Sequence, residues 1–157
     1  MLSRKDFLSL VLPPISGAEC YYVAEINYTD TNVKIRNKAA YSVDKILEAS
    51  DEIVTRLENA YFSTASYIDR GNGRKGINIA GKKIFYVDLD AGPTKPYATA
   101  KEALEDLKTF CKATGLPKPF LVSSGRGLHV YWVMDEAMSR STWHKHAEVL
   151  AALCETH

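Results

Sequence analysis

The sequence predicts an α+β fold, in which strands and helices are mixed along the chain. Segments rich in Tyr, Val, Ile and Phe, which are typical of strands, alternate irregularly with segments whose apolar residues recur about every 3.6 residues, as in helices. Residues 120–123 and 128–134 both have strand character and are separated only by a glycine-rich turn, which favours an antiparallel hairpin. A doubly wound parallel sheet would instead require a helix between consecutive strands.

The composition is that of one globular domain. The 157 residues are 46% hydrophobic and 25% charged, and the net charge of +1 neither demands nor excludes nucleic acid. No apolar run approaches the roughly 20 residues of a membrane span, and no signal peptide is visible, so we expect a cytoplasmic protein that does not contact membranes. Cys20, Cys111 and Cys154 are widely separated, which favours reduced, buried thiols over disulfides or a zinc site.

The first 60 residues contain two predicted helices and one predicted strand. Ser3 to Leu12 predicts a short helix that Pro13-Pro14 ends, because proline cannot continue a helix. Glu19 to Tyr28 is rich in Tyr, Val and Ile and predicts a strand, whereas the polar and basic residues 29–41 predict a loop. A second helix begins at Ser42, and its apolar positions keep the helical period: Val43, Ile46, Leu47, Ile53, Val54 and Leu57.

Four strands and two helices are predicted in the remainder. Tyr61 to Ile68 and Lys83 to Asp90 are predicted strands, separated by a glycine-rich segment. Thr99 and Glu102 form a capping box at the start of a helix that Gly115 ends. The two hairpin strands follow. A last helix starts near Ser139 or Ser141 and continues through Trp143, Ala147, Leu150, Ala151 and Cys154.

Two carboxylates, Asp88 and Asp90, end the strand 83–90. Residues two apart in a strand point to the same face, so these carboxylates lie together while Val87 and Leu89 face the core. Adjacent carboxylates repel one another unless a cation lies between them, and the hard ions Mg²⁺ and Mn²⁺ suit such ligands. The alternative is a simple strand-end turn in which the aspartates accept hydrogen bonds from backbone amides.

The hairpin turn Ser124-Gly125-Arg126-Gly127 has the character of an anion site. Glycines permit the backbone conformations in which successive amides form an anion-binding nest, and the guanidinium of Arg126 can hold two phosphate oxygens. His129 follows on the face opposite Leu128, Val130 and Trp132, where it can donate to a triphosphate. The alternative is an ordinary solvent-exposed hairpin with one histidine.

A basic stretch precedes the acidic strand. Arg70, Arg74, Lys75, Lys82 and Lys83 occur without an acidic residue among them. Such a stretch fits either a solvated loop or a surface that contacts the phosphate backbone of a nucleic acid.

The strand ending Asp88-Leu89-Asp90, followed by Ser-Gly-Arg-Gly-Leu-His-Val-Tyr-Trp at 124–132, resembles the archaeo-eukaryotic primase superfamily. The similarity is greatest to primase-polymerase modules of bacteriophages and mobile elements, and covers about residues 60–157. It implies an RRM-like sheet flanked by helices. It also implies that Asp88 and Asp90 bind Mg²⁺ or Mn²⁺, and that Ser124, Arg126, Gly127 and His129 contact the nucleotide, with His129 at the catalytic centre.

The family's third motif, another aspartate on a later strand, has no counterpart here. We therefore expect residues 1–157 to form one incomplete catalytic domain, with an N-terminal part at 1–60 and a motif-bearing part at 61–157. The isolated chain is then expected to bind metal and nucleotide weakly and to have doubtful activity.

The expected function is template-directed nucleotidyl transfer in DNA replication, by primer synthesis or polymerisation. The expected partners are a DNA template and primer, an NTP or dNTP, and a replicative helicase domain in the longer protein; a phage-encoded protein would act in the host cytoplasm. Two alternatives remain open: a non-catalytic DNA-binding or initiator domain, and a metal-dependent phosphoesterase or nuclease.

Overall fold

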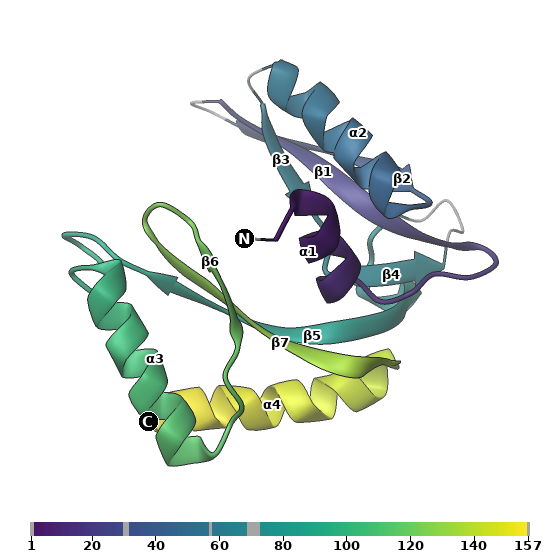
Figure 1. Ribbon diagram of the computed structural model, residues 1–157. Helices are drawn as coiled ribbons and strands as arrows, with labels where there is room; N and C mark the ends of the chain where they lie inside the picture. Colours follow the sequence, from purple (N-terminus) through teal and green to yellow (C-terminus); the bar gives the residue numbers. More distant parts are fainter. Residues whose placement is uncertain (1, 30–31, 57, 69–72, 157) are drawn as a thin grey trace. The chain divides into compact units, whose positions relative to one another are not determined.

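The computed structural model describes residues 2–29, 32–56, 58–68 and 73–156 (Figure 1). The helices are α1 (Arg4–Val11), α2 (Val43–Thr55), α3 (Ala100–Thr114) and α4 (Arg140–Thr156), with a 3₁₀ turn, η1 (Gly76–Asn78). The strands are β1 (Glu19–Thr29), β2 (Asn32–Ala40), β3 (Asn59–Phe62), β4 (Ala65–Ile68), β5 (Ile79–Asp90), β6 (Phe120–Ser123) and β7 (Gly127–Met138). The sheet has the strand order β2-β1-β4-β5-β7-β6, with β3 paired to β1. The predicted α+β class is confirmed.

The chain divides into two compact units. The first unit contains Met1–Lys83 and Asp135–Trp143, and the second contains Ile84–Met134 and His144–His157. Strands β5 and β7 and helix α4 each contribute residues to both.

The core of the first unit forms where α2 packs on β1 (Figure 1). Ser42 caps α2 by accepting a hydrogen bond from the amide of Lys45, as its position before the apolar period predicts. Ile46, Ala49 and Ile53 point inward from the helix, and Val23 of β1 is fully buried. Burial of these side chains is the main favourable contribution to folding of this layer.

Helix α1 has the capping box that a serine at its start allows. Ser3 and Asp6 exchange side-chain and backbone hydrogen bonds, and Leu8 and Val11 are buried. Phe7 packs edge-on against Phe62 of β3, with 6.3 Å between ring centroids.

Two predictions for the first unit are wrong. Residues 29–41 were expected to form a loop, but 32–40 form β2, an edge strand paired antiparallel with β1. Its residues are mostly exposed, so the polar composition reflects an exposed strand rather than a loop. The single strand expected at 61–68 is two strands, β3 and β4, interrupted where the hydroxyl and amide of Ser63 bond the backbone of Tyr22.

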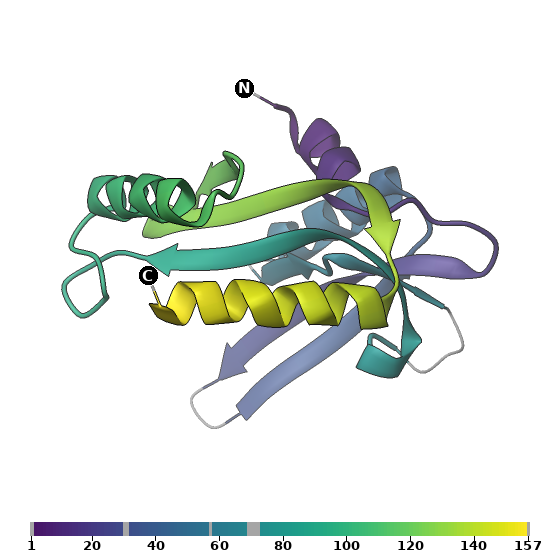
Figure 2. The same cartoon turned by 90° about the horizontal axis from the view of Figure 1, so that it is seen from below.

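In the second unit, α3 and α4 cover one face of β5 (Figure 2). Thr99 caps α3 and Gly115 ends it in the left-handed conformation at φ +73°, both as predicted. The capping box is only half formed, because the carboxylate of Glu102 accepts from the amide of Ala98 rather than from that of Thr99. The hairpin of β6 and β7 is confirmed, with Val122 opposite His129.

None of the three cysteines forms a disulfide with another described residue. All three were expected to be buried, but only Cys20 is; Cys111 is half-buried and Cys154 is exposed. Within the described ranges, no helix combines the length and the apolar character needed to cross a bilayer.

Candidate functional site

The two aspartates of β5 lie together on the face of the strand that α3 and α4 leave open. The side chains of Asp88 and Asp90 are each 46% exposed. Val87 and Leu89 point the other way and line a cavity of about 140 Å³ with Leu107 of α3 and other residues of the second unit. The alternation inferred from the sequence therefore places Val87 and Leu89 in an apolar environment and exposes Asp88 and Asp90 to solvent.

The turn at 124–127 is bonded directly to the end of the acidic strand. The amide of Ala91 donates to the carbonyl oxygen of Arg126 at 2.7 Å, and the amide of Ser124 donates to the carbonyl of Gly127 at 3.2 Å. The first bond joins residues more than thirty positions apart in the sequence, and the second closes the turn itself.

Gly127 allows this close approach because it has no side chain. A Cβ atom on Gly127 would lie 2.1 Å from the carbonyl oxygen of Leu89 and 3.1 Å from the Cα of Asp90. Only glycine fits at this distance. By contrast, a Cβ on Gly125 would meet nothing within 4 Å, although its φ of +82° favours glycine for conformational reasons.

His129 lies next to Asp88, with 3.7 Å between its Nε2 and Oδ1 of the carboxylate. Its ring also packs edge-on against Tyr86, and Tyr86 packs against Tyr131, at centroid distances of 5.7 and 5.2 Å. Burial, together with the negative charge of Asp88, raises the pKa of Tyr86 to about 12. Sequence reasoning missed Tyr86, although its position two residues before Asp88 places it on the same face of the strand.

Asp90 is paired with a cation from its own loop. The ammonium of Lys95 lies 2.6 Å from Oδ2 of Asp90. Sequence reasoning did not assign Lys95 a role, because a lysine in a polar loop has no pattern that distinguishes it from other surface lysines.

Ser124 and Arg126 are exposed at the tip of the hairpin. In the described part of the chain, no carboxylate lies within ion-pair distance of the Arg126 guanidinium. The side chain is therefore available to an anion from outside the protein.

The donor set suits a hard divalent cation. Among the described residues there is no group of three or more His, Cys, Asp or Glu side chains arranged to hold a metal ion. Asp88 and Asp90 nevertheless offer carboxylate oxygens on one exposed face, and Mg²⁺ usually binds through one or two carboxylates, with waters and substrate phosphates as its other ligands. The pair fits that coordination.

The basic stretch is divided by the fold. Arg70 lies outside the described residues, and Arg74 and Lys75 lie just before η1. Lys82 and Lys83 are neighbours on β5 and point in different directions. The ammonium of Lys82 lies 3.4 Å from the ring centroid of Trp143, and burial lowers its pKa.

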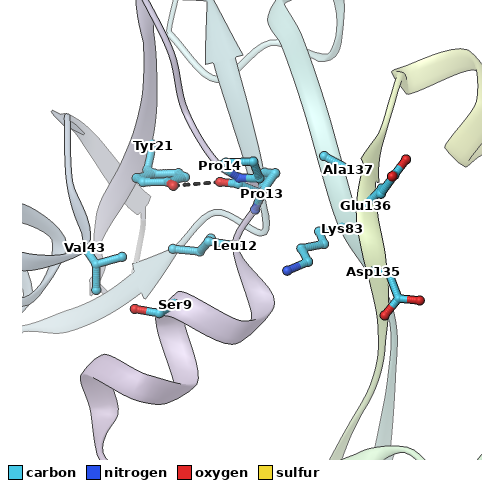
Figure 3. Close-up of a pocket in the computed structure, with 10 residues that line it drawn as sticks. All are labelled: Ser9, Leu12, Pro13, Pro14, Tyr21, Val43, Lys83, Asp135, Glu136 and Ala137. Atoms are coloured by element: carbon cyan, nitrogen blue, oxygen red, sulfur yellow. Dashed lines mark hydrogen bonds between the residues drawn. The ribbon is translucent and has the colours of Figure 1, made fainter.

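Lys83 instead lines a pocket of about 500 Å³ in the first unit, together with Ser9, Leu12, Tyr21 and Asp135 (Figure 3). The wall of this pocket is fixed in part by the hydroxyl of Tyr21, which donates to the carbonyl of Pro13 at 2.7 Å. Lys83 is therefore poorly placed to share a surface with Lys82.

Arg140 joins Arg74 and Lys75 near η1. Its guanidinium lies within 4.0 Å of the position that a Cβ of Gly76 would occupy. Sequence reasoning missed Arg140 because it is far along the chain, at the start of α4. In the described ranges, Arg74, Lys75 and Arg140 form no ion pair with a carboxylate. We call these three residues the η1 basic surface.

Comparisons with protein-family models, with curated proteins and with solved structures find no match to this chain.

Proposed function

We propose that this chain is part of the catalytic domain of a metal-dependent nucleotidyltransferase of the primase-polymerase type. Such an enzyme adds nucleotides to a primer on a DNA template. The observation that carries the proposal is the bond between Ala91 and Arg126. It holds a pair of exposed carboxylates beside a glycine-rich turn whose guanidinium, Arg126, has no carboxylate partner among the described residues. Nucleotidyl transfer needs both parts, a metal-binding acidic pair and a cationic phosphate site.

In this proposal each side chain has a defined task. Asp88 and Asp90 hold Mg²⁺ or Mn²⁺, which when bound neutralises phosphate charge and activates the attacking hydroxyl. Arg126 holds two oxygens of the triphosphate and Ser124 donates its hydroxyl to a third. His129 orients the phosphate beside Asp88, and the amides near Gly125 and Gly127 bind phosphate oxygens.

These residues act by position and charge rather than by forming a covalent intermediate. Phosphoryl transfer requires the attacking and leaving oxygens to be in line, and most of its catalysis is positioning and charge neutralisation. Rigid attachment of the turn to β5 through Ala91 and Gly127 provides that positioning.

A primer-extension assay tests the proposal. The chain is incubated with a labelled primer on a DNA template, Mn²⁺ and either dNTPs or NTPs, beside Asp88→Asn and Asp90→Asn variants. Longer products that both variants fail to make support nucleotidyl transfer. Synthesis that persists in both variants would remove the acidic pair from the mechanism, and shortened primers would indicate a nuclease instead.

The second candidate is a nucleic-acid-binding module without catalysis, and the η1 basic surface favours it. Arg74, Lys75 and Arg140 have no carboxylate partner in the part of the chain that the structure describes, and arginine forks match phosphate oxygens. This candidate predicts DNA binding that is insensitive to EDTA and weakens steeply with salt. Binding that requires Mn²⁺ would contradict it.

A further inference from the structure

Lys95 occupies the place on Asp90 that a metal ion would take. Its ammonium contacts Oδ2 at 2.6 Å, while Asp88 on the same face has no ammonium or guanidinium partner among the described residues. Both partners are about half exposed, with side-chain exposures of 48% for Lys95 and 46% for Asp90. An exposed ion pair of this kind contributes little to stability, so exchange of the lysine for a divalent ion is easy.

The loop that carries Lys95 is held in place by backbone bonds. The amide of Gly92 donates to the carbonyl of Tyr97 at 2.8 Å, and the amide of Lys95 donates to the carbonyl of Gly92 at 3.1 Å. Tyr97 is in turn fixed to α3, because its hydroxyl donates to the carboxylate of Asp106 at 2.6 Å. A lysine displaced from Asp90 therefore stays beside the acidic pair.

This loop and the hairpin turn meet at the end of β5. Ala91, which follows Asp90, is bonded to Arg126 by its amide and pairs with Tyr97 as a β-bridge. The cations of Lys95 and Arg126 thus extend from two segments that are joined at the same residue. A polyphosphate bound at the acidic pair would have one cation on each segment.

We infer that Lys95 is a phosphate ligand of the bound nucleoside triphosphate, which leaves Asp90 when a divalent ion binds there and then contacts the triphosphate. The inference rests on the proposed function, because it requires a metal and a nucleotide at Asp88 and Asp90. In this inference Lys95 contacts first Asp90 and then the triphosphate, and the two contacts have opposite effects on ligand binding. The lysine competes with the metal before the nucleotide binds, and it holds the nucleotide afterwards.

The competing explanation is that Lys95 only stabilises its loop. In that case its removal would lower melting temperature and weaken metal and nucleotide binding together. If Lys95 were only a counter-charge for Asp90, its removal would strengthen metal binding and leave nucleotide affinity unchanged. The two-partner role alone predicts effects of opposite sign on the two ligands.

The experiment measures Mn²⁺ binding by the free-ion EPR signal, and binding of a fluorescent ATP analogue at saturating Mn²⁺, for the wild-type chain and Lys95→Met. We expect Lys95→Met to bind Mn²⁺ about fivefold more tightly, because the substitution removes the repulsion between one nearby positive charge and the ion in water. It should bind the nucleotide about tenfold more weakly, as expected for one lost charge-assisted hydrogen bond. Lys95→Arg should retain most of the nucleotide affinity.

Lys101→Met is the matched control, because Lys101 is an exposed lysine near the start of α3 in the same unit. It should change neither affinity. Unchanged nucleotide binding by Lys95→Met, with wild-type binding intact, would overturn the role of Lys95 while leaving the proposed function standing. Mn²⁺ and nucleotide binding that persist in an Asp88→Asn/Asp90→Asn variant would instead overturn the proposed function, and this inference with it.

Discussion

Carboxylates on α2 and on β5 are in different environments. On α2, Asp44 pairs with Lys5, Asp51 with Arg4, and Glu52 with both Lys38 and Arg56, at 2.6–3.2 Å. On β5, Asp90 has one ammonium partner, whereas Asp88 has His129 at 3.7 Å and a hydrogen bond with Tyr86 but no ammonium or guanidinium partner among the described residues. The α2 carboxylates are neutralised by the protein itself, whereas the β5 carboxylates keep capacity for an external cation.

Cations show the same contrast. Arg4, Arg36, Lys38 and Arg56 of the first unit are engaged by carboxylates on α2 and β1. The three cations of the η1 basic surface have no carboxylate partner in the part of the chain that the structure describes, and neither does Arg126 of the second unit. The cations that pair with carboxylates of α2 and β1 serve the fold, whereas these four cations are available to ligands; Lys95, which pairs with Asp90, is the exception.

The largest expected effect comes from Gly127→Ala, which tests whether close contact with Gly127 holds the hairpin turn beside the β5 carboxylates. The new methyl group would collide with the Leu89 carbonyl, so the hairpin must move away from Asp90. We expect a loss of about 3 kcal/mol in the free energy of unfolding, near the upper end for overpacking. Urea titration followed by circular dichroism measures it.

Gly125→Ala is the control for this change. Its methyl group meets no neighbour, so only the cost of placing alanine at a φ of +82° remains, about 1 kcal/mol. Equal losses in the two variants would mean that the contact with Leu89 is not what fixes the turn.

The next effect is on DNA binding, where we expect a difference between cations of the η1 basic surface and a cation that is paired with a carboxylate. Arg74→Ala and Arg140→Ala should each weaken binding of single-stranded DNA several-fold. Each should also lower the slope of log affinity against log salt by about one, because each removes a phosphate contact. Arg4→Ala, which removes a cation already paired with Asp51, should leave both quantities unchanged. Fluorescence anisotropy at several salt concentrations measures them, and equal losses in all three variants would contradict the distinction.

A smaller effect concerns Tyr97, which supports the Lys95 loop. Its hydrogen bond to Asp106, with a further contribution from burial, raises the pKa of Tyr97 to about 12. Because the neutral phenol is favoured in the folded protein, this contribution to stability is complete below about pH 10 and is lost as pH rises through about 12. Asp106→Asn should lower the pKa of Tyr97 toward about 10, as seen in the phenolate absorbance, with Tyr97→Phe identifying the signal. No change between wild type and Asp106→Asn would rule out the bond.

The smallest effect is expected at the exposed pair of Arg4 and Asp51. The hydrogen bond from Arg4 lowers the pKa of Asp51. A lowered carboxyl pKa gives stability that is present above the ordinary value of about 4 and is lost as pH falls through the folded-state value. When the pH falls from about 6 to about 3, the free energy of unfolding of Arg4→Met should therefore decrease slightly less than that of wild type. Urea midpoints at the two pH values measure this; a larger acid-side loss in the variant would reverse the sign.

Local signals in the sequence were sufficient for most of the fold. Ser42 and Thr99 cap helices where the apolar period begins, and Gly115 ends α3, because these signals act within one turn of chain. The edge strand β2 was not predicted, because its stability comes from pairing with β1 and not from its own composition.

The candidate site was only partly predictable for a related reason. Strand alternation correctly placed Asp88 and Asp90 on one face, and the glycines correctly marked a tight turn. Lys95 pairs with Asp90 within one irregular loop, where no periodic pattern indicates which side chains meet. The position of Arg140 depends on a tertiary contact with Gly76, for which a single sequence gives no local signal. Lys82 was assigned to the same surface as Lys83, but it lies over Trp143.

The most direct test of the account is Mn²⁺-dependent binding of a labelled dNTP to three chains: wild type, Asp88→Asn/Asp90→Asn, and Asp44→Asn/Asp51→Asn. The last removes the same charge from carboxylates that are already paired on α2. We predict that wild type and the α2 variant bind with equal affinity, and that the β5 variant loses metal-dependent binding. Equal binding by all three chains, or metal-independent binding by each, would contradict a nucleotide site at the end of β5.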